Sequence, residues 1–343
     1  MKLKYLLPLC AILFIFSCAE DPIPVEEEME EEMEEEEVIE ICDTDRYTSP
    51  SFVELDSVTV MYAESNMDTG HPDDLFMDIY MPAEGTDTLS QRPVMIWAFG
   101  GAFIAGDREQ VHFLAKKSAS LGFVSASIDY RILEVLFPLP DSTKMMDTAI
   151  KASSDMKAAI RYFVQDANTD NKYKIDPDQI YVGGISAGAI TALLTGVVDE
   201  SDIDNEFLQG LIDSNGGIHG NTGSAENQSY SYDVAGIVNY SGAVYKREFI
   251  DADDPAIFSV HGDIDEVVPF NVGKPNIQIF EIDFTLHGSK SIFDRSQEVG
   301  LRNDLVAIEG GGHTDIYTED QFAQNREDFF VLGEQFIKDE ICN

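Results

Sequence analysis

Residues 179–188 read Gln-Ile-Tyr-Val-Gly-Gly-Ile-Ser-Ala-Gly, and this stretch decides the fold. Its first half is rich in β-branched and aromatic residues, which favour a buried strand, and the small and aliphatic residues of 187–198 favour a helix. Ser186 therefore lies where a strand turns sharply into a helix. Gly184 and Gly188 let neighbouring backbone pass close by, and the strained turn raises the hydroxyl above the sheet edge. The pattern predicts a nucleophilic serine, with an ordinary strand-to-helix turn as the alternative.

The rest of the chain alternates strands and helices around this stretch. Strands are expected at 52–62, 75–81, 93–99, 123–130, 234–240, 256–261 and 305–309. Helices are expected at 109–121, 141–165 and 319–338. Such alternation indicates an α/β fold, a mostly parallel sheet with helices on both faces. The polar stretch 199–233 is long for a connection, so we expect an insertion or a lid there.

The N-terminus has the pattern of an export signal. Two lysines precede an apolar stretch at 6–16 that is too short to span a membrane comfortably. Residues 14–18, Phe-Ile-Phe-Ser-Cys, resemble the lipobox of bacterial lipoproteins, in which the cysteine becomes the lipidated N-terminus. This resemblance implies a signal peptide at 1–17 and an anchor at Cys18 in the bacterial outer membrane. The next residues, Ala-Glu-Asp, resemble export tags of surface lipoproteins in Bacteroidetes-type bacteria; an ordinary signal cleaved near Ala19 is the alternative.

The chain carries a formal net charge of -42. This charge argues against binding to nucleic acid or attraction to an anionic membrane surface. Thirteen of the 64 acidic residues lie between Glu20 and Glu40, where no basic residue occurs. Like charges in a run oppose a helix, and little apolar surface is available, so we expect 18–40 to be an extended, disordered tether. The catalytic domain is expected at 41–343.

Cysteine use suggests one disulfide. Cys10 leaves with the signal and Cys18 is taken by lipid, so Cys42 and Cys342 remain at the two ends of the domain. In an exported protein, we expect these two to form a disulfide. Two free thiols are the alternative.

A serine hydroxyl needs a general base, and the base needs an orienting carboxylate. His313 is the favoured base, because it lies on a glycine-rich loop directly after an expected strand. Asp265 is the favoured acid and Asp263 the second choice, since both follow another strand end. The remaining candidate bases are interpreted as packed or surface residues: His71, His112, His219, His261 and His287.

Five segments together resemble α/β-hydrolases of the carboxylesterase and lipase type over most of 52–340. They are Trp97-Ala-Phe-Gly-Gly-Ala-Phe103, Ser127-Ile-Asp-Tyr-Arg131, residues 175–188, the His-Gly-x-x-Asp of 261–265, and Gly312-His313. The order Ser, Asp, His along the chain is that of this family. The resemblance implies a central sheet of about eight strands.

The resemblance also implies an oxyanion hole. The backbone N–H groups of Gly101 and Ala102 would take that part, with Ala187 as the other donor. Phe99 stands where relatives carry a histidine, so the hydrogen bonds by which that histidine steadies the loop are expected to be missing.

The implied reaction is acyl transfer from a carboxylic ester, small or polymer-borne, to Ser186 and then to water, with no metal or organic cofactor. A carbohydrate acetyl or feruloyl esterase is the alternative within enzymes. A non-catalytic surface binding module is a third hypothesis, which retention of all three catalytic residues disfavours. Acyl length, alcohol and oligomeric state do not follow from the sequence, because fold does not determine substrate.

Overall fold

The protein is described by a computed structural model that covers residue 42 and residues 44–65, 73–133, 139–277 and 282–343. Residues 45–343 form one compact unit. The predicted signal peptide, the predicted lipidation site Cys18 and the predicted acidic tether lie outside the described residues. Cys42 and Cys342 are both disulfide-bonded, as the cysteine count predicts.

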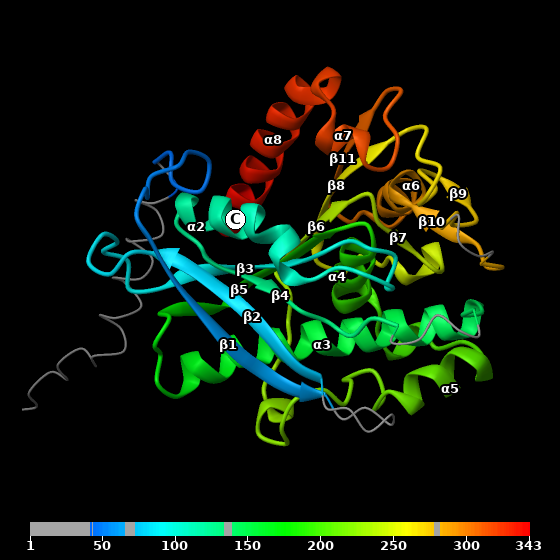
Figure 1. Ribbon diagram of the computed structural model, residues 1–343, viewed down its shortest axis with the longest axis horizontal. Coiled ribbons are helices and arrows are strands. Elements are labelled where there is room, and N and C mark those ends of the chain that lie inside the picture. Colours follow the sequence, from blue (N-terminus) through cyan, green and yellow to red (C-terminus); the bar gives the residue numbers. More distant parts are fainter. Residues whose placement is uncertain (1–41, 43, 66–72, 134–138, 278–281) are drawn as a thin grey trace, which may run out of the picture. The chain divides into compact units, whose positions relative to one another are not determined.

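An eight-stranded sheet runs through this unit in the order β1-β2-β4-β3-β5-β6-β8-β11 (Figure 1). Its strands are β1 Leu55–Ser65, β2 Asp73–Pro82, β3 Arg92–Ala98, β4 Val124–Ile128, β5 Ile175–Ile185, β6 Gly236–Tyr240, β8 Ala256–Gly262 and β11 Asn303–Ile308. β2 is antiparallel to β1 and to β4, and every other neighbouring pair is parallel. Every residue of β3, β4, β6 and β8 is buried. Parallel strands covered on both faces require such continuously apolar sequences.

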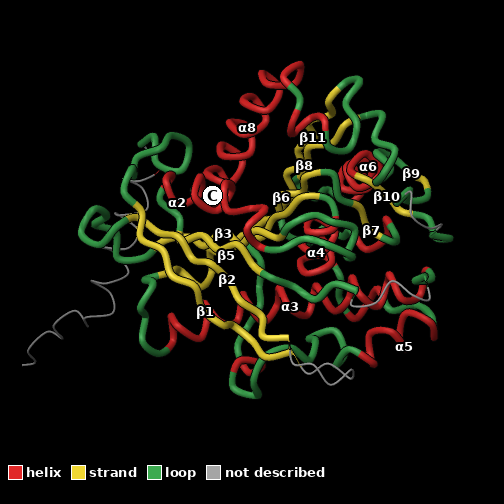
Figure 2. The backbone as a smooth tube through the Cα atoms, in the orientation of Figure 1, coloured by secondary structure: helices red, strands yellow, loops and turns green. Residues whose placement is uncertain are grey.

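Helices cover both faces of the sheet (Figure 2). They are α2 His112–Leu121, α3 Ser142–Asn168, α4 Ala187–Val197, α5 Glu206–Ser214, α6 Ser289–Val299, α7 Asp315–Thr318 and α8 Ala323–Ile341. On one face, Trp97 of β3 donates from Nε1 to Ser118 of α2 at 3.0 Å, and Tyr240 of β6 packs against Phe329 of α8. On the other face α4 packs against β5, β6 and α3. The sheet is therefore the middle of three layers.

Helix α3 begins where its sequence predicts. Asp141 is the N-cap, and its side chain accepts a hydrogen bond from the Lys144 amide at 2.9 Å. An aspartate at this position satisfies one of the amides that a helix start leaves unpaired. The capped end places the first turns of α3 beside the carboxyl ends of the strands, where the site lies.

Several elements differ from the expectations. A small antiparallel sheet, β7 Ala243–Val244, β10 Leu286–Gly288 and β9 Val272–Gly273, is not predicted, and neither is α6. The strands of this sheet are too short to show an alternating pattern. Helix α8 begins at Ala323 instead of residue 319, because 320–322 forms a separate turn after α7. The insertion 199–233 contains α5, which starts at the N-cap Asn205.

Candidate active site

Ser186 occupies a strained turn between β5 and α4. Its φ is 57° and its ψ is -118°, a conformation that non-glycine residues rarely adopt. A Cβ added to Gly184 would lie 2.3 Å from the Gly188 backbone, and one added to Gly188 would lie 2.2 Å from the Ala98 carbonyl oxygen. Both glycines are thus required by close backbone approach, which is the arrangement that the Gly-x-Ser-x-Gly pattern predicts.

The structure brings Ser186, His313 and Asp265 into one hydrogen-bonded row. Ser186 Oγ lies 2.8 Å from His313 Nε2, and His313 Nδ1 lies 2.6 Å from Asp265 Oδ2. His313 is on the loop after β11, and Asp265 is on the loop after β8. The three side chains follow the ends of β5, β8 and β11, so their meeting depends on the strand order β5-β6-β8-β11. This row has the distances that a nucleophile, a base and an orienting acid require.

Asp265 is buried and surrounded by donors. Burial alone would raise the pKa of its carboxyl, but hydrogen bonds from His261 and His313 hold that pKa well below its ordinary value. Oδ1 also accepts hydrogen bonds from the amides of Val267 at 2.8 Å and Val268 at 3.0 Å. Such donors favour the ionised form. The carboxylate is therefore charged and fixed in orientation at neutral pH.

Asp263, the second choice for the acid, has another contact. Its Oδ1 accepts a hydrogen bond from the Gly310 amide at 2.7 Å and so links the loop after β8 to the loop after β11.

The other described histidines have partners other than Ser186. His112 contacts Asp78, His219 contacts Tyr232, His287 contacts Ser291, and His261 contacts Asp265 and Ser289. His71 lies outside the described residues. None of the other four lies within hydrogen-bond distance of Ser186 in the part of the chain that the structure describes.

The loop after β3 lies against the serine turn. A Cβ added to Gly100 would be 3.4 Å from Ser186 Cβ and 3.1 Å from the Ile185 carbonyl oxygen. Gly101 and Ala102 have φ values of 131° and 55°. Among the described residues, none accepts a backbone hydrogen bond from the amides of Gly101, Ala102 or Ala187. These three donors are therefore available to a developing oxyanion.

Phe99 packs in this loop at the position where the resemblance implies a histidine. Its ring is stacked on Tyr130, with centroids 4.2 Å apart, and the Tyr130 hydroxyl donates to the Phe99 carbonyl oxygen at 2.6 Å. The Leu133 amide also donates to the Phe103 carbonyl oxygen at 2.7 Å. Sequence reasoning missed the role of Tyr130, although it lies in the quoted segment 127–131. Stacking and backbone hydrogen bonds thus replace the expected histidine contacts.

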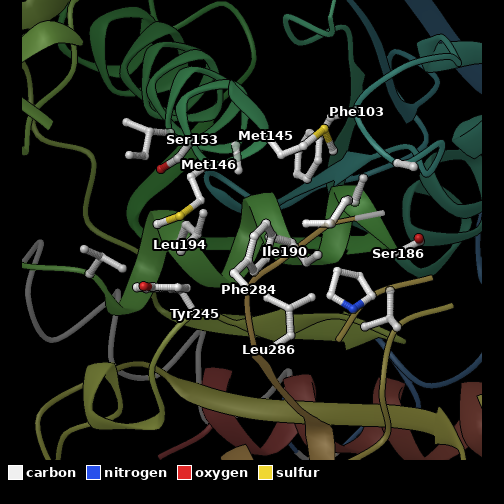
Figure 3. A pocket seen from close by; sticks show the side chains of 18 of the residues that line it. Phe103, Met145, Met146, Ser153, Ser186, Ile190, Leu194, Tyr245, Phe284 and Leu286 are labelled. Carbon is white, nitrogen blue, oxygen red and sulfur yellow. The ribbon is translucent and has the colours of Figure 1, made fainter. Parts of the chain in front are cut away.

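An apolar pocket extends from Ser186 along α4 (Figure 3). Its cavity volume is about 130 Å³, many times the ~10–15 Å³ that one water needs, so it has room for part of a ligand. The lining includes Met145 and Met146 from α3, Ile190 and Leu194 from α4, and Phe284 and Leu286 from the segment before α6. In Figure 3, Ile190 and Leu194 mark successive turns of α4 that lead away from Ser186. The lining includes positions on and flanking α4 from Ser186 to Val198, a stretch over which a helix rises about 18 Å.

The insertion 199–233 contributes apolar walls to this pocket. Leu208 and Ile212 of α5 and Ile218 all line it, although the insertion as a whole is polar. The sequence suggests a lid or a substrate-side insertion here. It does not identify the residues that face the pocket, because only three of the insertion's side chains reach it.

Two further properties bear on what the site can do. No group of three or more His, Cys, Asp or Glu side chains among the described residues could hold a metal ion. No helix in the described ranges is both long and apolar enough to cross a membrane.

The activated serine, the amide donors and the apolar pocket together suit attack on a carbonyl that carries an apolar substituent.

Several known proteins are similar to this chain. Residues 77–245 match the family model BD-FAE. A probable isoprenylcysteine α-carbonyl methylesterase from Oryza sativa subsp. japonica is 25% identical over 269 residues, which are 73% of this chain and 57% of that relative. A fumonisin B1 esterase from Sphingopyxis macrogoltabida is 30% identical over 142 residues, which are 40% of this chain and 26% of that relative. This chain thus matches little more than half the length of the first relative.

A solved structure shows the same fold. Esterase 2 from the Planctomycetes species Thermogutta terrifontis superposes with a TM-score of 0.58 at 20% identity, covering 82% of this chain and 91% of that chain. The predicted α/β-hydrolase fold is therefore confirmed. The sequence relatives and the solved structure named here are esterases by name.

Proposed function

We propose that this α/β-hydrolase is a serine esterase that cleaves carboxylic esters through an acyl-enzyme on Ser186. The observation that carries the proposal is the row in which His313 contacts Ser186 at 2.8 Å and Asp265 at 2.6 Å. The relatives named above are esterases by name, which supports the same reaction class.

The first half of the reaction forms the acyl-enzyme. His313 Nε2 takes the proton of the Ser186 hydroxyl as Oγ attacks the ester carbonyl, and Asp265 stabilises the resulting imidazolium. The carbonyl oxygen becomes an oxyanion, which the amides of Gly101, Ala102 and Ala187 bind. The carbon–oxygen bond to the alcohol then breaks, and the imidazolium returns its proton to the leaving alcohol.

The second half releases the acid. His313 takes a proton from water, whose oxygen attacks the acyl carbonyl and forms a second oxyanion in the same hole. Collapse breaks the bond to Ser186 Oγ, which recovers its proton from His313. Each residue acts in the same place in both halves, so one arrangement serves the whole cycle.

The apolar pocket indicates an aliphatic or aromatic substituent on one side of the ester. Its lining is mostly aliphatic and aromatic side chains, which offer few hydrogen bonds to a sugar ring. This observation favours an ester with an apolar acyl or alcohol group over a carbohydrate ester seated in the pocket. A binding module without activity would gain nothing from the strained Ser186 backbone.

The test is covalent labelling followed by an ester series. A fluorophosphonate probe should label the purified chain, and Ser186→Ala should not be labelled. Hydrolysis of p-nitrophenyl acetate, butyrate and octanoate should fall by on the order of 10⁶ in that variant, because the nucleophile is lost. Acetylated xylan, assayed in parallel, tests the carbohydrate alternative. A folded wild-type chain that neither labels nor hydrolyses any ester would overturn the proposal.

We also propose that the enzyme is exported and held at the bacterial outer membrane by lipid on Cys18. The lipobox-like residues 14–18 support this location. Cells given a radioactive fatty acid should label the wild type and not Cys18→Ser, and the variant should leave the membrane fraction. Equal labelling and fractionation of both would favour the ordinary signal peptide.

A further inference from the structure

We propose that His261, held in one tautomer by Ser289, positions Asp265 by donating to the same carboxylate oxygen that His313 uses. This inference rests on the proposed function, since it concerns the orienting acid of that reaction. It gives a role to a histidine that the reaction steps do not use.

His261 lies on β8 and is completely buried, yet both of its ring nitrogens have partners. Nδ1 is 2.8 Å from Ser289 Oγ. Nε2 is 3.1 Å from Asp265 Oδ2 and 3.1 Å from the Val268 carbonyl oxygen. Both nitrogens of this buried ring are therefore satisfied within the protein.

The direction of the hydrogen bonds can be traced from a backbone amide. The Gly242 N–H donates to Asn239 Oδ1 at 2.9 Å, which fixes the side-chain amide of Asn239 with its NH₂ on the other side. That NH₂ donates to Ser289 Oγ at 3.0 Å. Ser289 Oγ therefore accepts a hydrogen bond from the Asn239 amide. Its own hydroxyl hydrogen remains available for donation to His261 Nδ1.

The other side of the ring requires a donor. Both groups that face Nε2 are acceptors: a carboxylate oxygen and a backbone carbonyl oxygen. A proton on Nε2 and none on Nδ1 is the neutral arrangement that satisfies every partner. The network from Gly242 to Asp265 thus selects one tautomer of His261.

This tautomer of His261 makes it a hydrogen-bond donor to Asp265 Oδ2. Oδ2 accepts hydrogen bonds from His313 at 2.6 Å and from His261 at 3.1 Å, while Oδ1 accepts hydrogen bonds from two backbone amides. The titratable groups around the carboxylate are the two histidines and Tyr317, whose pKa burial raises above its ordinary value. With four donors, the carboxylate keeps its orientation while His313 gains and loses its proton. His261 is therefore a positioning residue that acts through Asp265.

The chain offers a matched pair of variants for the test. Ser289 and Ser259 are both completely buried, and each hydroxyl lies 3.0 Å from Asn239 Nδ2. Of the two, Ser289 contacts His261. Ser289→Ala and Ser259→Ala remove the same group from the same cluster, but Ser289→Ala also removes the donor that sets the tautomer.

The readout is the second-order rate at which a fluorophosphonate labels Ser186, measured with the kcat and KM of p-nitrophenyl butyrate hydrolysis. We expect Ser289→Ala to lower the labelling rate and kcat by about threefold to tenfold with KM unchanged, because one hydrogen bond to a charged group is weakened. Ser259→Ala should stay within about twofold of wild type. His261→Gln, which can still offer an amide donor near Nε2, should retain more activity than His261→Leu.

A double-mutant cycle distinguishes positioning from a general loss of packing. In the Asp265→Asn background, Ser289→Ala should have no further effect on labelling, because the carboxylate through which it acts is gone. Two results would overturn the inference while leaving the esterase proposal intact: equal rates for the two serine variants, or an undiminished Ser289→Ala effect in the Asp265→Asn background. A folded wild type that does not label would overturn both.

Discussion

The two ends of the apolar pocket bury charge in opposite ways. At the Ser186 end, the buried carboxylate of Asp265 has four hydrogen-bond donors. At the other end, Lys157 is only 4% exposed, and its ammonium donates to the Ile218 carbonyl oxygen at 2.6 Å and lies 4.7 Å from the centre of the Tyr232 ring. Neither Lys157 nor its neighbour Arg161 forms an ion pair with an acid of the described part of the chain. The Ser186 end therefore stabilises the charge of Asp265, whereas the other end buries the charge of Lys157 without a carboxylate partner among the described residues.

The difference shows in the pKa values. Donors lower the pKa of Asp265 and so stabilise its ionised form. Burial, with Arg161 nearby, lowers the pKa of Lys157 to about 7, which destabilises its charged form. In the proposed reaction the Asp265 charge orients His313. The Lys157 charge instead attaches the insertion, because Lys157 and Arg161 donate to the carbonyl groups of Ile218 and His219. The comparison teaches that the two ends of one pocket are built differently. Hydrogen bonds to a buried carboxylate fix the Ser186 end, whereas the shape of the other end depends on where the insertion is attached to α3.

The largest effect is expected when the charge of Asp265, at the Ser186 end of the pocket, is removed. Asp265→Asn should lower kcat by about 10³–10⁴-fold, because an amide favours the wrong tautomer of His313 and cannot stabilise its charged form. The measurement is hydrolysis of p-nitrophenyl butyrate, with circular dichroism to show that the variant is folded. Activity within tenfold of wild type would mean that Asp265 is not the orienting acid.

At the opposite end, Lys157→Met should change stability rather than chemistry. Between pH 7 and 10.5 the unfolded chain binds a proton at Lys157 that the folded chain has lost, so wild-type stability rises with pH over this window. The gain in free energy of unfolding from the methionine should therefore be greatest below pH 7, on the order of a few kcal/mol before the lost contacts are subtracted, and shrink toward pH 10.5. Urea unfolding at several pH values measures it.

Two controls sharpen that prediction. Lys116→Met, on the other face of the sheet, should leave the pH dependence of stability unchanged. Acetate hydrolysis by Lys157→Met should match wild type, since the change lies far along the pocket. A stability difference that is the same at every pH would show that the Lys157 charge is not suppressed by burial.

A smaller effect is expected midway between the two ends of the pocket. Leu194→Trp should fill the pocket beyond Ile190 and so exclude a long acyl chain. Forcing extra atoms into a packed site costs about 1–3 kcal/mol, so the ratio of octanoate to acetate hydrolysis should fall by about tenfold. Val331→Trp, at an exposed position of α8, is the matched control. An unchanged ratio would mean that the apolar substituent does not lie along α4.

The parts of the site that can be predicted from sequence depend on local chain geometry. Gly184, Ser186 and Gly188 form their turn from contacts within a few residues and with β3, so a short pattern is sufficient to identify it. His313 and Asp265 follow strands whose apolar runs are evident, and the order of the strands places them together. The parallel sheet follows from the alternation of strands and helices for the same reason.

The parts that sequence reasoning misses depend on distant segments. The pocket draws single side chains from α3, α4, α5 and the segment before α6, and no periodicity in one segment indicates that they meet. Helix α6 has a charged sequence with few apolar positions, yet its first residue, Ser289, reaches His261 twenty-eight positions earlier. In the sequence, Phe99 indicates only that the hydrogen bonds of a histidine are missing. Its stacking on Tyr130 cannot be predicted, because the fold must first bring residues 99 and 130 together.

The hydrogen bond from the Gly310 amide to Asp263 has a mechanical consequence. It ties the loop that carries the acid to the loop that carries the base, so a thermal displacement of one loop is transmitted to the other. We therefore expect the distance between acid and base to vary less than the distance from this pair of loops to the serine turn.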